Sequence, residues 1–365
     1  MLEYIWVLCE ELDSTESFDE TRAKNIWTFN DFEAAKRSYD LKMIGSWFLA
    51  STPQDYNTSV PLFPETAKDL GLTYGFNRAK LAWYTIDEVF YKPSRPSNIT
   101  ADDISLPYAR PIEEQEIRPN KDIPEGQAQK IREFNIAYYP SERGPYNYDT
   151  LSSYSAGLNP DGTLRSPETR WGGIMRKLES TDFEATNIEY IEFWLMDPFI
   201  ENPYHSGGKL YFNLGEVSED ILRDGRKSFE NGLPISSEII DVDSTIWGRV
   251  PKLQAVVNAF SNDPQSRQYQ DIGYDGLSST DERNYHQTFL QKIQNQVEAQ
   301  AYNNILADPS ADDFTYFRNQ SYDQNDIKIT DRYKKYNNTE GNSSVVSDNS
   351  QYSSHLVSDF NTFRT

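Results

Sequence analysis

Residues 170–234, RWGGIMRKLESTDFEATNIEYIEFWLMDPFIENPYHSGGKLYFNLGEVSEDILRDGRKSFENGLP, contain two segments in which apolar and polar side chains alternate. The first segment spans residues 190–196, and the second spans residues 209–214 and follows a Gly207-Gly208 turn signal. Because successive side chains of a strand point to opposite sides, each segment predicts a strand with one buried face and one wetter face. The residues predicted to face the core are Ile191, Phe193, Leu195, Leu210, Phe212 and Leu214.

The composition favours a large β-rich protein that does not bind nucleic acid. The chain has 365 residues, enough for a large core, and carries 57 acidic against 35 basic residues, a net charge of -22. This charge repels phosphate backbones and anionic lipid headgroups, so nucleic acid is not an expected partner. The 24 Tyr, 19 Phe and 7 Trp residues suit β-structure better than a helical bundle.

The ends of the chain and its cysteine content limit what can be said of its location. A lone Cys9 cannot form an internal disulfide, so it carries no information about an oxidising compartment. No run of 18 apolar residues predicts a transmembrane helix. The N-terminal sequence MLEYIWVLCEELD is acidic where a signal peptide would be basic. We therefore expect an internal fragment of a longer protein rather than a chain with two natural ends.

Other strand patterns extend the predicted sandwich over residues 23–250, after an unassigned segment at residues 1–22. The segment NIWTFNDFEAAKRSYDLKMIGSWFLASTP, which begins at Asn25, predicts a strand, an acidic turn and a second strand through Trp47 to Ala50 that stops at Pro53. The segment KLAWYTIDEVFY at 80–91 predicts another strand. The segment EFNIAYYP predicts a strand that stops at Pro140, whereas the Pro- and acid-rich residues 93–125 predict a long irregular excursion.

After Val250 the apolar period changes from two to about 3.6, which predicts helices over residues 251–306. Pro251 fits the first turn of a helix ending before Pro264. A second helix is predicted from about residue 280 to residue 304. Its apolar face comprises Phe289, Leu290, Ile293, Val297 and Ile305. The polar residues 307–365 predict an irregular surface segment that ends in disorder near 337–354.

Common catalytic motifs are absent from the sequence. His205, His286 and His355 lie far apart and lack the spacing of a metal-binding or triad motif. Carboxylate pairs such as Asp31 with Glu33, or Glu189 with Glu192, could serve as a glycosidase acid and base, but solvated faces and turn caps explain such pairs more simply in so acidic a chain.

The segment DIGYDGLSSTDE at 271–282 follows the template of a calcium-binding loop. Its candidate ligands are Asp271, Asp275, Leu277 through its backbone carbonyl, Ser279 and Glu282. Gly273 stands where the template has Asp or Asn, which removes one ligand. The alternative is a capping box, in which Ser279 and Glu282 cap the following helix. Calcium is thus the one cofactor that the sequence suggests.

Two shorter acidic motifs and two aromatic residues have simpler structural interpretations. DPSADDF at 308–314 and NPDGT at 159–163 are weaker versions of the calcium loop and are interpreted as turns. Trp194 and Tyr211 could stack on a sugar ring, but we expect them to pack under a neighbouring loop.

A series of long motifs closely resembles the SprA/Sov family, in the same order from about residue 25 to about residue 344. The motifs include NDFEAA, NRAKLAWYTID, AYYPSERGPYNYD, RWGGIMR, IEFWLMDPF, GGKLYFNLGEVSEDILRDGRKSFENGLP, WGRVP, QDIGYDGLSSTDE and DRYKKYNNTEGNS. Residues 1 to about 22 lack the family pattern, and family members are several times longer. Trp171, Trp194, Asp197 and the segment Asp224 to Arg226 belong to these motifs and are expected to be structural anchors, not catalytic groups.

The resemblance implies that the chain is a segment of the giant outer-membrane β-barrel translocon of the type IX secretion system. In Bacteroidetes this translocon also serves gliding motility. Its implied partners are secreted cargo proteins and other components of that system, including a smaller outer-membrane shuttle barrel. The repeated ten-residue segments of a lipid-facing barrel are few here, so we expect a water-exposed domain inserted between barrel strands.

The fold class expected from these observations is β-rich α+β: a jelly-roll-like, galactose-binding-like β-sandwich with long loop insertions and a small helical segment. The leading functional hypothesis is a non-enzymatic domain that shapes or caps the pore mouth and contacts cargo or partners at the outer membrane or cell surface. The alternative is a carbohydrate-binding jelly-roll module. A hydrolase would need a carboxylate pair at a set separation in a cleft.

Overall fold

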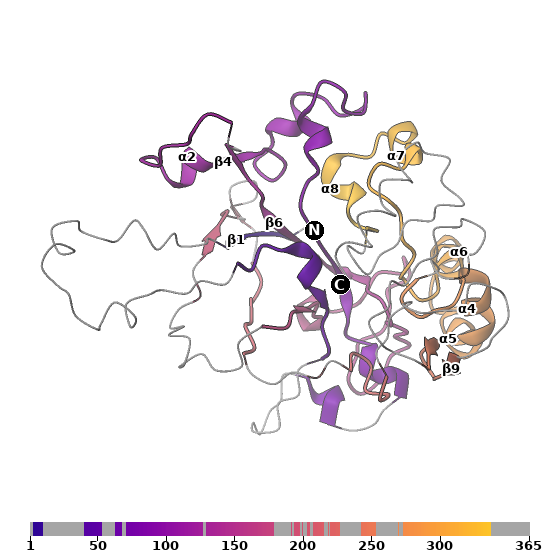
Figure 1. Ribbon diagram of the computed structural model, residues 1–365. Coiled ribbons are helices and arrows are strands. Elements are labelled where there is room, and N and C mark those ends of the chain that lie inside the picture. The colour runs from indigo at the N-terminus through magenta and orange to yellow at the C-terminus, as the bar shows by residue number, and fades with distance from the viewer. Residues whose placement is uncertain are drawn as a thin grey trace, which may run out of the picture.

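A computed structural model describes most of the chain between residues 40 and 336, together with a short N-terminal strand (Figure 1). The described residues are 3–9, 40–52, 63–67, 71–126, 129–178, 191, 193–197, 199, 203–204, 207–214, 218, 220–226, 242–252, 269 and 273–336. The predicted helix after Pro251, the strand expected before residue 40 and the predicted disorder at 337–354 lie outside the described residues.

The described elements are short and mixed in type. The strands are β1 (Glu3–Cys9), β2 (Phe48–Leu49), β3 (Ala79–Tyr84), β4 (Ile112–Glu113), β5 (Lys130–Ile131), β6 (Phe134–Arg143), β7 (Ile174–Met175), β8 (Phe193–Leu195), β9 (Val242–Ser244) and β10 (Arg249–Pro251). The α-helices are α2 (Glu114–Ile117), α4 (Ser279–Tyr285), α5 (Gln287–Ile293), α6 (Ala299–Ala307), α7 (Gln320–Gln324) and α8 (Ile329–Arg332). The 3-10 helices are η2 (Ile44–Ser46), η3 (Pro64–Ala67), η4 (Gly71–Gly75), η5 (Glu88–Tyr91), η6 (Asp103–Ser105) and η7 (Pro167–Thr169).

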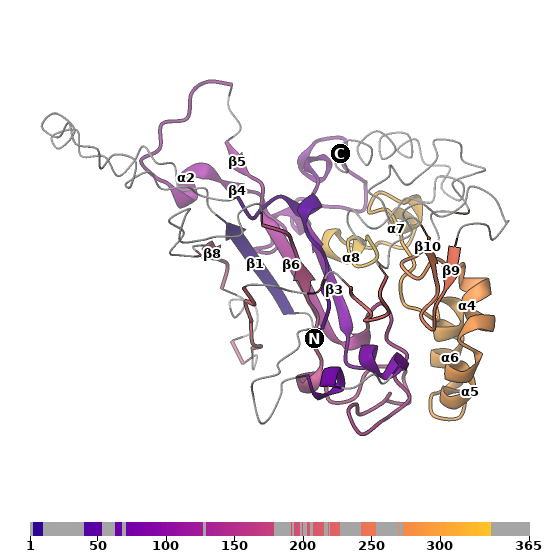
Figure 2. The same ribbon diagram turned by 60° about the horizontal axis from the view of Figure 1, so that its bottom comes forward.

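The largest sheet is antiparallel and has four strands in the order β3-β6-β1-β8, which Figure 2 shows side by side. The long strand β6 pairs on one side with β3, where Leu81 lies opposite Tyr138. On its other side it pairs with β1, where Ile5 lies opposite Ile136. Residues 3–9, which the sequence left unassigned, therefore form an inner strand of the sheet.

The strand predicted at 80–91 is confirmed in its first part as β3, whereas residues 88–91 form the 3-10 helix η5, and both faces of β3 are buried. Leu81 and Trp83 belong to one hydrophobic cluster, and Ala82, Tyr84 and Ile86 belong to a second. Alternation along a strand separates side chains onto opposite faces, so β3 contributes to two cores at once. The sheet consequently lies between two layers of packed residues rather than exposing a wet face at this strand.

Strand β6 runs past Pro140, where the sequence predicted that it would stop. Lys80 pairs with Tyr139 but its neighbour Ala79 pairs with Arg143, so the register shifts and the residues between the two pairs bulge out of the ladder. A proline lacks the N–H that the ladder needs, and a bulge is one of the few places in a sheet that tolerates it. The bulge explains why the strand continues beyond Pro140.

The two strands predicted at 190–196 and 209–214 are the main correction to the sequence-based picture. Only residues 193–195 form a strand, β8, and residues 207–214 have no regular structure. The side chains predicted to face the core are largely exposed instead; the exposed ones are Ile191, Leu195, Leu210, Phe212 and Leu214, whereas Phe193 is half-buried. Alternation gives the relative orientation of side chains, and a second layer has to cover one face before that face becomes a core.

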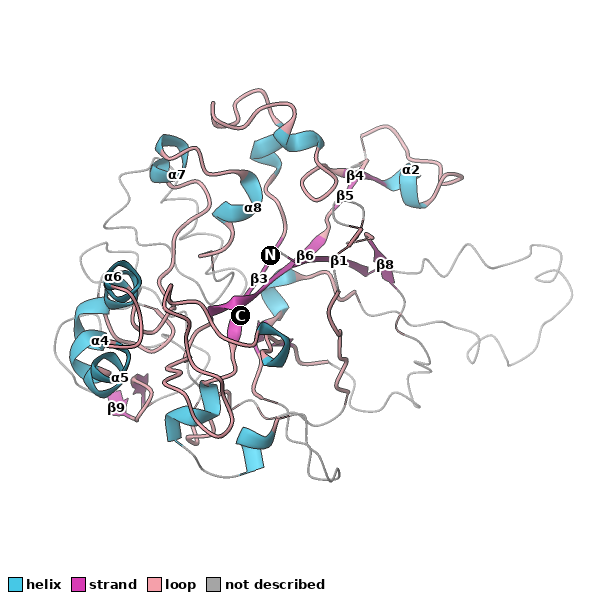
Figure 3. Cartoon of the chain, turned by 180° about the vertical axis from the view of Figure 1, so that it is seen from behind, coloured by secondary structure: helices cyan, strands magenta, loops and turns pink. Residues whose placement is uncertain are grey.

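The helix predicted at 280–304 is divided into α4, α5 and α6, which pack together on one side of the molecule (Figures 1 and 3). One break falls at His286, and the second lies between Ile293 and Ala299. At the second break the N–H of Glu298 donates to the carbonyl of Pro160 at 2.6 Å, which starts α6 in a new direction. The predicted apolar face is nevertheless correct, because all five of its residues are buried: Phe289, Leu290, Ile293, Val297 and Ile305.

The C-terminal segment contradicts the prediction of an irregular surface in its described part, residues 307–336. Tyr316, Phe317, Ile329 and Tyr333 are buried in the second hydrophobic cluster. The Tyr333 ring stacks on that of Tyr84 in β3, with centroids 4.3 Å apart. Its aromatic residues supply enough apolar area to dock the segment even though the surrounding sequence is polar.

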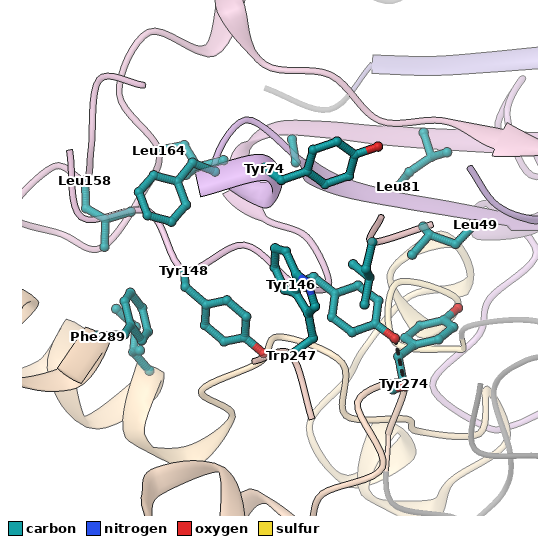
Figure 4. Close-up of a cluster of buried hydrophobic side chains, with 14 of the residues drawn as sticks. Leu49, Tyr74, Leu81, Tyr146, Tyr148, Leu158, Leu164, Trp247, Tyr274 and Phe289 are labelled. Atoms are coloured by element: carbon teal, nitrogen blue, oxygen red, sulfur yellow. Dashed lines mark hydrogen bonds between the residues drawn. The ribbon is translucent and has the colours of Figure 1, made fainter. Parts of the chain in front are cut away.

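The helices and the sheet are joined by an aromatic core (Figure 4). Tyr146 and Tyr148, which follow β6, pack against Trp247 at ring-centroid distances of 6.1 and 6.2 Å. Tyr148 also makes an edge contact with Phe289 of α5. The Tyr146 hydroxyl donates to the carbonyl of Tyr274 at 2.7 Å, which holds the loop before α4 against this core.

The described residues thus form a mixed α and β structure with small sheets. Besides the four-stranded sheet there are three two-stranded ones: β10-β9, β2-β7 and β4-β5. Pro251 lies in β10 opposite Val242, which corrects the expectation that it begins a helix. The structure does not confirm a jelly-roll sandwich, which requires two facing antiparallel sheets. Among the described helices, none is long and apolar enough to cross a membrane.

Candidate metal centre

Three carboxylates from separate parts of the chain meet in the interior beside α4. Asp275 lies in the loop after β10, Glu282 lies in α4, and Asp312 lies in the turn after α6. One oxygen of each lies within 4.8 Å of the others, in an arrangement that could hold a metal ion. We call Asp275, Glu282 and Asp312 the carboxylate cluster. None of the three residues is more than 3% exposed.

The start of α4 differs by one residue from the predicted capping box. The N-cap is Ser278, whose side-chain oxygen accepts from the N–H of Asp281 at 3.3 Å. The predicted cap, Ser279, is the first residue of the helix and donates instead to Asp313 at 3.1 Å. With the cap placed at Ser278, the helix directs Glu282 inward, and the side chain of Glu282 is free of any capping role.

Ser310 connects two members of the carboxylate cluster. Its hydroxyl donates to Oδ2 of Asp275 at 2.6 Å, and its N–H donates to Oε2 of Glu282 at 2.9 Å. The Tyr148 hydroxyl donates to Oγ of Ser310 at 3.0 Å. Asp312 is tied in through the N–H of Asp275, which donates to its Oδ2 at 3.0 Å. These bonds fix the outer sides of the carboxylates, as outer-shell bonds fix metal ligands.

His286 lies one helical turn after Glu282 and faces the same cluster. Its ring stacks on Tyr148, with centroids 4.1 Å apart, and only 3% of the residue is exposed. The Nε2 atom lies 3.7 Å from Oδ2 of Asp275, which is longer than a hydrogen bond. The spacing of the three histidines did not indicate that this imidazole would approach carboxylates. The four-residue spacing between Glu282 and His286 could have indicated it, because side chains at this spacing lie on one face of a helix.

Burial raises the pKa of every member of the carboxylate cluster. Burial and then the charge of Asp275 raise the pKa of Glu282 to about 9. Burial, followed by the charges of Asp275 and Glu282, raises the pKa of Asp312 well above its usual value. Burial also raises the pKa of Asp275, against the opposing effects of His286 and Ser310. The cluster is therefore unfavourable in its fully ionised form unless positive charge is added.

Three cationic groups lie near the cluster. Arg143 is buried and donates to the carbonyl oxygens of Asn147 and Pro309. Lys335 lies 3.4 Å from Asp308. Burial lowers the pKa of Lys80 to about 8, although Asp308 and Asp312 act in the opposite direction. These groups reduce the negative potential around the three carboxylates.

The structure brings together part of the predicted calcium loop and adds a residue that the loop lacked. Asp275 and Glu282 converge, whereas Asp271 lies outside the described residues. Leu277 is fully buried, and its N–H donates to Oδ1 of Asp275 at 2.8 Å. A Cβ on Gly273 would lie 2.7 Å from the carboxylate of Asp312. Asp312 therefore fills the space beside the glycine that had seemed to weaken the loop.

The predicted structural anchors lie in different surroundings. Trp171 is half-buried beneath the guanidinium of Arg78, 4.5 Å from the ring centroid. Asp224 is half-buried and accepts from the N–H of Arg226, which forms a 2.5 Å ion pair with Asp243. Burial raises the pKa of Asp224.

Trp194 and Asp197 lie on the surface, at and after strand β8. Trp194 is 52% exposed, and Asp197 is exposed and accepts from the N–H of Phe199 at 2.8 Å. Tyr211 is also 52% exposed. The expectation that Trp194 and Tyr211 pack under a loop is therefore wrong within the described residues. The carboxylate pairs considered for a glycosidase, at residues 31 and 33 and at 189 and 192, lie outside them.

Other apolar side chains on β8 and in the described residues after it are also exposed. Phe193 of β8 contacts Phe212, with ring centroids 5.7 Å apart, which links residues 207–214 to the sheet. We call these exposed residues the apolar strip; its members are Trp194, Leu195, Phe199, Tyr204, Leu210, Tyr211, Phe212 and Leu214. Successive residues of a strand point to opposite faces, so both faces of β8 carry exposed apolar side chains. Large exposed apolar surfaces are typical of interaction sites.

Comparison with known proteins gives one match. Residues 288–363 match the family model SprA_N, described as a motility related/secretion protein. The matched segment begins in α5 and includes Asp312 of the carboxylate cluster. No curated protein matches the chain.

Proposed function

From the match at residues 288–363, which supports membership of the SprA/Sov family and a role in motility or secretion at the cell envelope, we propose a specific function for this chain. It is a non-enzymatic domain of the outer-membrane translocon of the type IX secretion system. In the full-length protein it is a jelly-roll-like insert of the giant barrel. There it shapes or caps the pore mouth and contacts cargo or partner proteins during export and gliding motility.

The observation that carries this proposal is the apolar strip. Trp194 and Phe212 are each 52% exposed, and Tyr204 is 97% exposed. Strand β8 lies at the edge of its sheet, so a polypeptide can approach both the strip and the strand edge. A protein segment passing through a pore presents extended backbone and apolar side chains, which match such a surface.

The burial of the carboxylate cluster supports a non-enzymatic role. Its three residues are at most 3% exposed, so a macromolecular substrate cannot reach the carboxylates in this conformation. A glycosidase needs two carboxyl groups that flank a sugar in an open cleft. The cluster is therefore suited to holding the fold together rather than to catalysis.

The net charge of the chain supports weak and selective contact between this domain and its cargo. A net charge of -22 repels acidic cargo at long range. The apolar strip then offers a local area of attraction within an otherwise repulsive surface. This combination suits a surface that folded or partly folded cargo touches and leaves again.

The proposal is tested by substituting the strip in the full-length translocon. Trp194→Glu combined with Phe212→Glu places charges on exposed positions, where folding tolerates them. We expect secretion of cargo to fall at least about tenfold, the equivalent of about 1.4 kcal/mol of lost contact energy. The measurement is the amount of a secreted reporter in the medium, with the amount of translocon in the outer membrane measured in parallel.

The matched control is Met43→Glu, because Met43 is 58% exposed and lies outside the strip. This variant should secrete normally. Normal secretion by the double strip variant, at unchanged translocon level, would refute a contact role for the strip.

A carbohydrate-binding module is the second candidate, and the exposure of Trp194, Tyr204 and Tyr211 favours it. Aromatic rings on a surface can stack on sugar rings. A glycan array on the chain distinguishes the two functions. Specific sugar binding that is lost in Trp194→Ala would support this second function, whereas binding to no glycan would leave protein contact as the function of the strip.

A further inference from the structure

The carboxylate cluster concentrates negative charge in a site that water does not reach. Asp275, Glu282 and Asp312 have oxygens within 4.8 Å of one another, and none is more than 3% exposed. Like charges at this separation repel strongly where the dielectric constant is low. The native arrangement therefore requires either bound protons or a bound cation.

Two further carboxylates, Asp308 and Asp313, lie close to the cluster. The N–H groups of Asp312 and Asp313 donate to Oδ1 of Asp308 at 3.0 and 3.4 Å. A bound cation would reduce the repulsion among these neighbouring carboxylates.

Two buried polar atoms facing the cluster give an independent indication of a ligand. Oε1 of Glu282 and Nε2 of His286 are buried, and among the described residues neither has a hydrogen-bond partner. The imidazole is 3% exposed, and its Nε2 lies 3.7 Å from Oδ2 of Asp275. Buried polar groups are almost always satisfied, so atoms left without a partner in a polar site indicate a missing ligand.

The hydrogen bonds of the cluster are arranged as in a metal site. Asp275 accepts at both oxygens, from the N–H of Leu277 and from the hydroxyl of Ser310. Glu282 and Asp312 each accept at Oε2 or Oδ2, from the N–H of Ser310 and the N–H of Asp275 respectively. Such outer bonds orient ligands and leave other lone pairs available for an ion. Gly273 adds to this arrangement, because only a residue without a Cβ leaves room for the carboxylate of Asp312.

We propose that Asp275, Glu282 and Asp312 together bind one hard divalent cation, with His286 beside it. Carboxylate oxygens are the preferred ligands of Ca²⁺, Mg²⁺ and Mn²⁺. In a calcium-binding loop the protein ligands all come from one short segment of the chain. This site differs, because its third carboxylate, Asp312, comes from a separate turn. The ion joins α4 to the turn that follows α6 and so holds the C-terminal segment in place.

The cation is a structural ligand, and its effect is on stability rather than on transport chemistry. An ion that binds the folded chain and not the unfolded chain raises the melting temperature in proportion to the logarithm of its concentration. The inference is independent of the proposed function, because it concerns how the chain is held together and not what the chain contacts.

The test is a thermal melt of the 365-residue chain. The chain is freed of metal with EDTA and then melted alone or with millimolar Ca²⁺, Mg²⁺ or Mn²⁺. We expect at least one of these ions to raise the melting temperature by about 5 °C, and elemental analysis to find one ion per chain. A larger shift with Mn²⁺ than with Ca²⁺ would add the imidazole to the ligand set, because Ca²⁺ prefers oxygen alone.

Asp312→Asn tests the assignment of the ligands. This variant keeps the shape of the side chain and removes one buried negative charge, so the metal-free chain should fold at least as stably as before. Its affinity for the ion should fall at least about tenfold, measured by calorimetric titration. The matched control, Asp122→Asn, changes an exposed carboxylate and should keep the full response.

Two results would overturn the proposal. The first is a melting temperature that none of the three ions changes, in which case bound protons satisfy the cluster. The second is an unchanged ion response in Asp312→Asn, which would place any bound ion elsewhere on the chain.

Discussion

Two buried charged groups, the Asp149–Arg170 pair and the carboxylate cluster, neutralise their charge in different ways. The guanidinium of Arg170 lies 2.8 Å from Oδ2 of Asp149, and both side chains are fully buried. Arg170 also donates to the carbonyl oxygens of Phe76, Arg165 and Gly157. The carboxylate cluster is equally buried, but two polar atoms that face it, Oε1 of Glu282 and Nε2 of His286, have no hydrogen-bond partner among the described residues.

The two groups differ in whether the chain alone supplies a partner for every buried polar atom. In the first group every polar atom has a partner within the chain: Asp149 accepts from Ser155 and from the N–H groups of Leu151 and Gly157. A complete network of this kind is self-sufficient. The carboxylate cluster leaves Oε1 of Glu282 and Nε2 of His286 unsatisfied, and this is why we assign it an ion. Three changes test the comparison, from the largest expected effect to the smallest.

Arg170→Ala should have the largest effect, because it leaves the carboxylate of Asp149 buried without its cation. Breaking a buried pair in this way costs about 3–5 kcal/mol. The measurement is the free energy of unfolding from urea denaturation. The control is Arg110→Ala, which removes a half-exposed pair with Glu116 and should cost under about 1 kcal/mol. Equal losses in the two variants would contradict the special role of the Asp149–Arg170 pair.

Glu133 is a buried carboxyl that belongs neither to the Asp149–Arg170 pair nor to the carboxylate cluster, and the Asn135 amide lies beside it. We expect this carboxyl to make the free energy of unfolding depend on pH. Burial raises its pKa from 4.5 to about 7. The folded chain then binds this proton more tightly than the unfolded chain, so stability is greatest below pH 4.5 and decreases as the pH rises through 7. The decrease attributable to Glu133 is about 3 kcal/mol in full.

Glu133→Gln should remove this part of the pH dependence, and unfolding measured at several pH values between 4 and 8 would show it as a flatter profile. Glu88→Gln, at an exposed position, should leave the profile unchanged. A profile that is the same in Glu133→Gln as in the natural chain would show that this carboxyl is not the group that titrates.

Gly273→Ala should have the smallest effect of the three and bears on the carboxylate cluster. Gly273 has a φ of +105°, and a Cβ there would lie 2.7 Å from Asp312. We expect a loss of about 1–3 kcal/mol and a weaker response to the ion, because the carboxylate of Asp312 must move. Gly225→Ala is the matched control: its φ is +77°, but a Cβ there would meet nothing within 4 Å. Both variants are compared by thermal melts with and without the ion, and equal ion responses would contradict the fit of Asp312 beside Gly273.

Sequence patterns predicted individual elements better than their surroundings. The alternation in 80–91 predicted β3, although residues 88–91 form the 3-10 helix η5. The helical period after residue 280 identified five of the six buried apolar residues of α5, α6 and the loop between them, and it missed Ala301. The same alternation in 190–214 predicted a buried face that is exposed, because nothing among the described residues covers it. A local sequence pattern indicates which side chains share a face, whereas the burial of that face depends on what packs against it.

The candidate site was partly predictable for the same reason. Asp275 and Glu282 belong to one local motif, so their spacing indicated a cation loop. Asp312 belonged to a separate motif that was interpreted as a turn, and it joins the site only after α6 returns the chain toward α4, a step that no short-range pattern encodes. His286 follows Glu282 by four residues, a helical spacing that could have placed both on one face of α4.

By itself the sequence determined the family resemblance, the acidic charge, the strand β3, the apolar face of the helices and the two carboxylates of one loop. These properties depend on residues that are close together along the chain. The tertiary structure alone decided that Asp312 joins that loop and that the apolar strip stays exposed. It also decided that Tyr333 docks on Tyr84 from almost the other end of the chain. These properties depend on contacts between distant segments, which packing of the whole core selects.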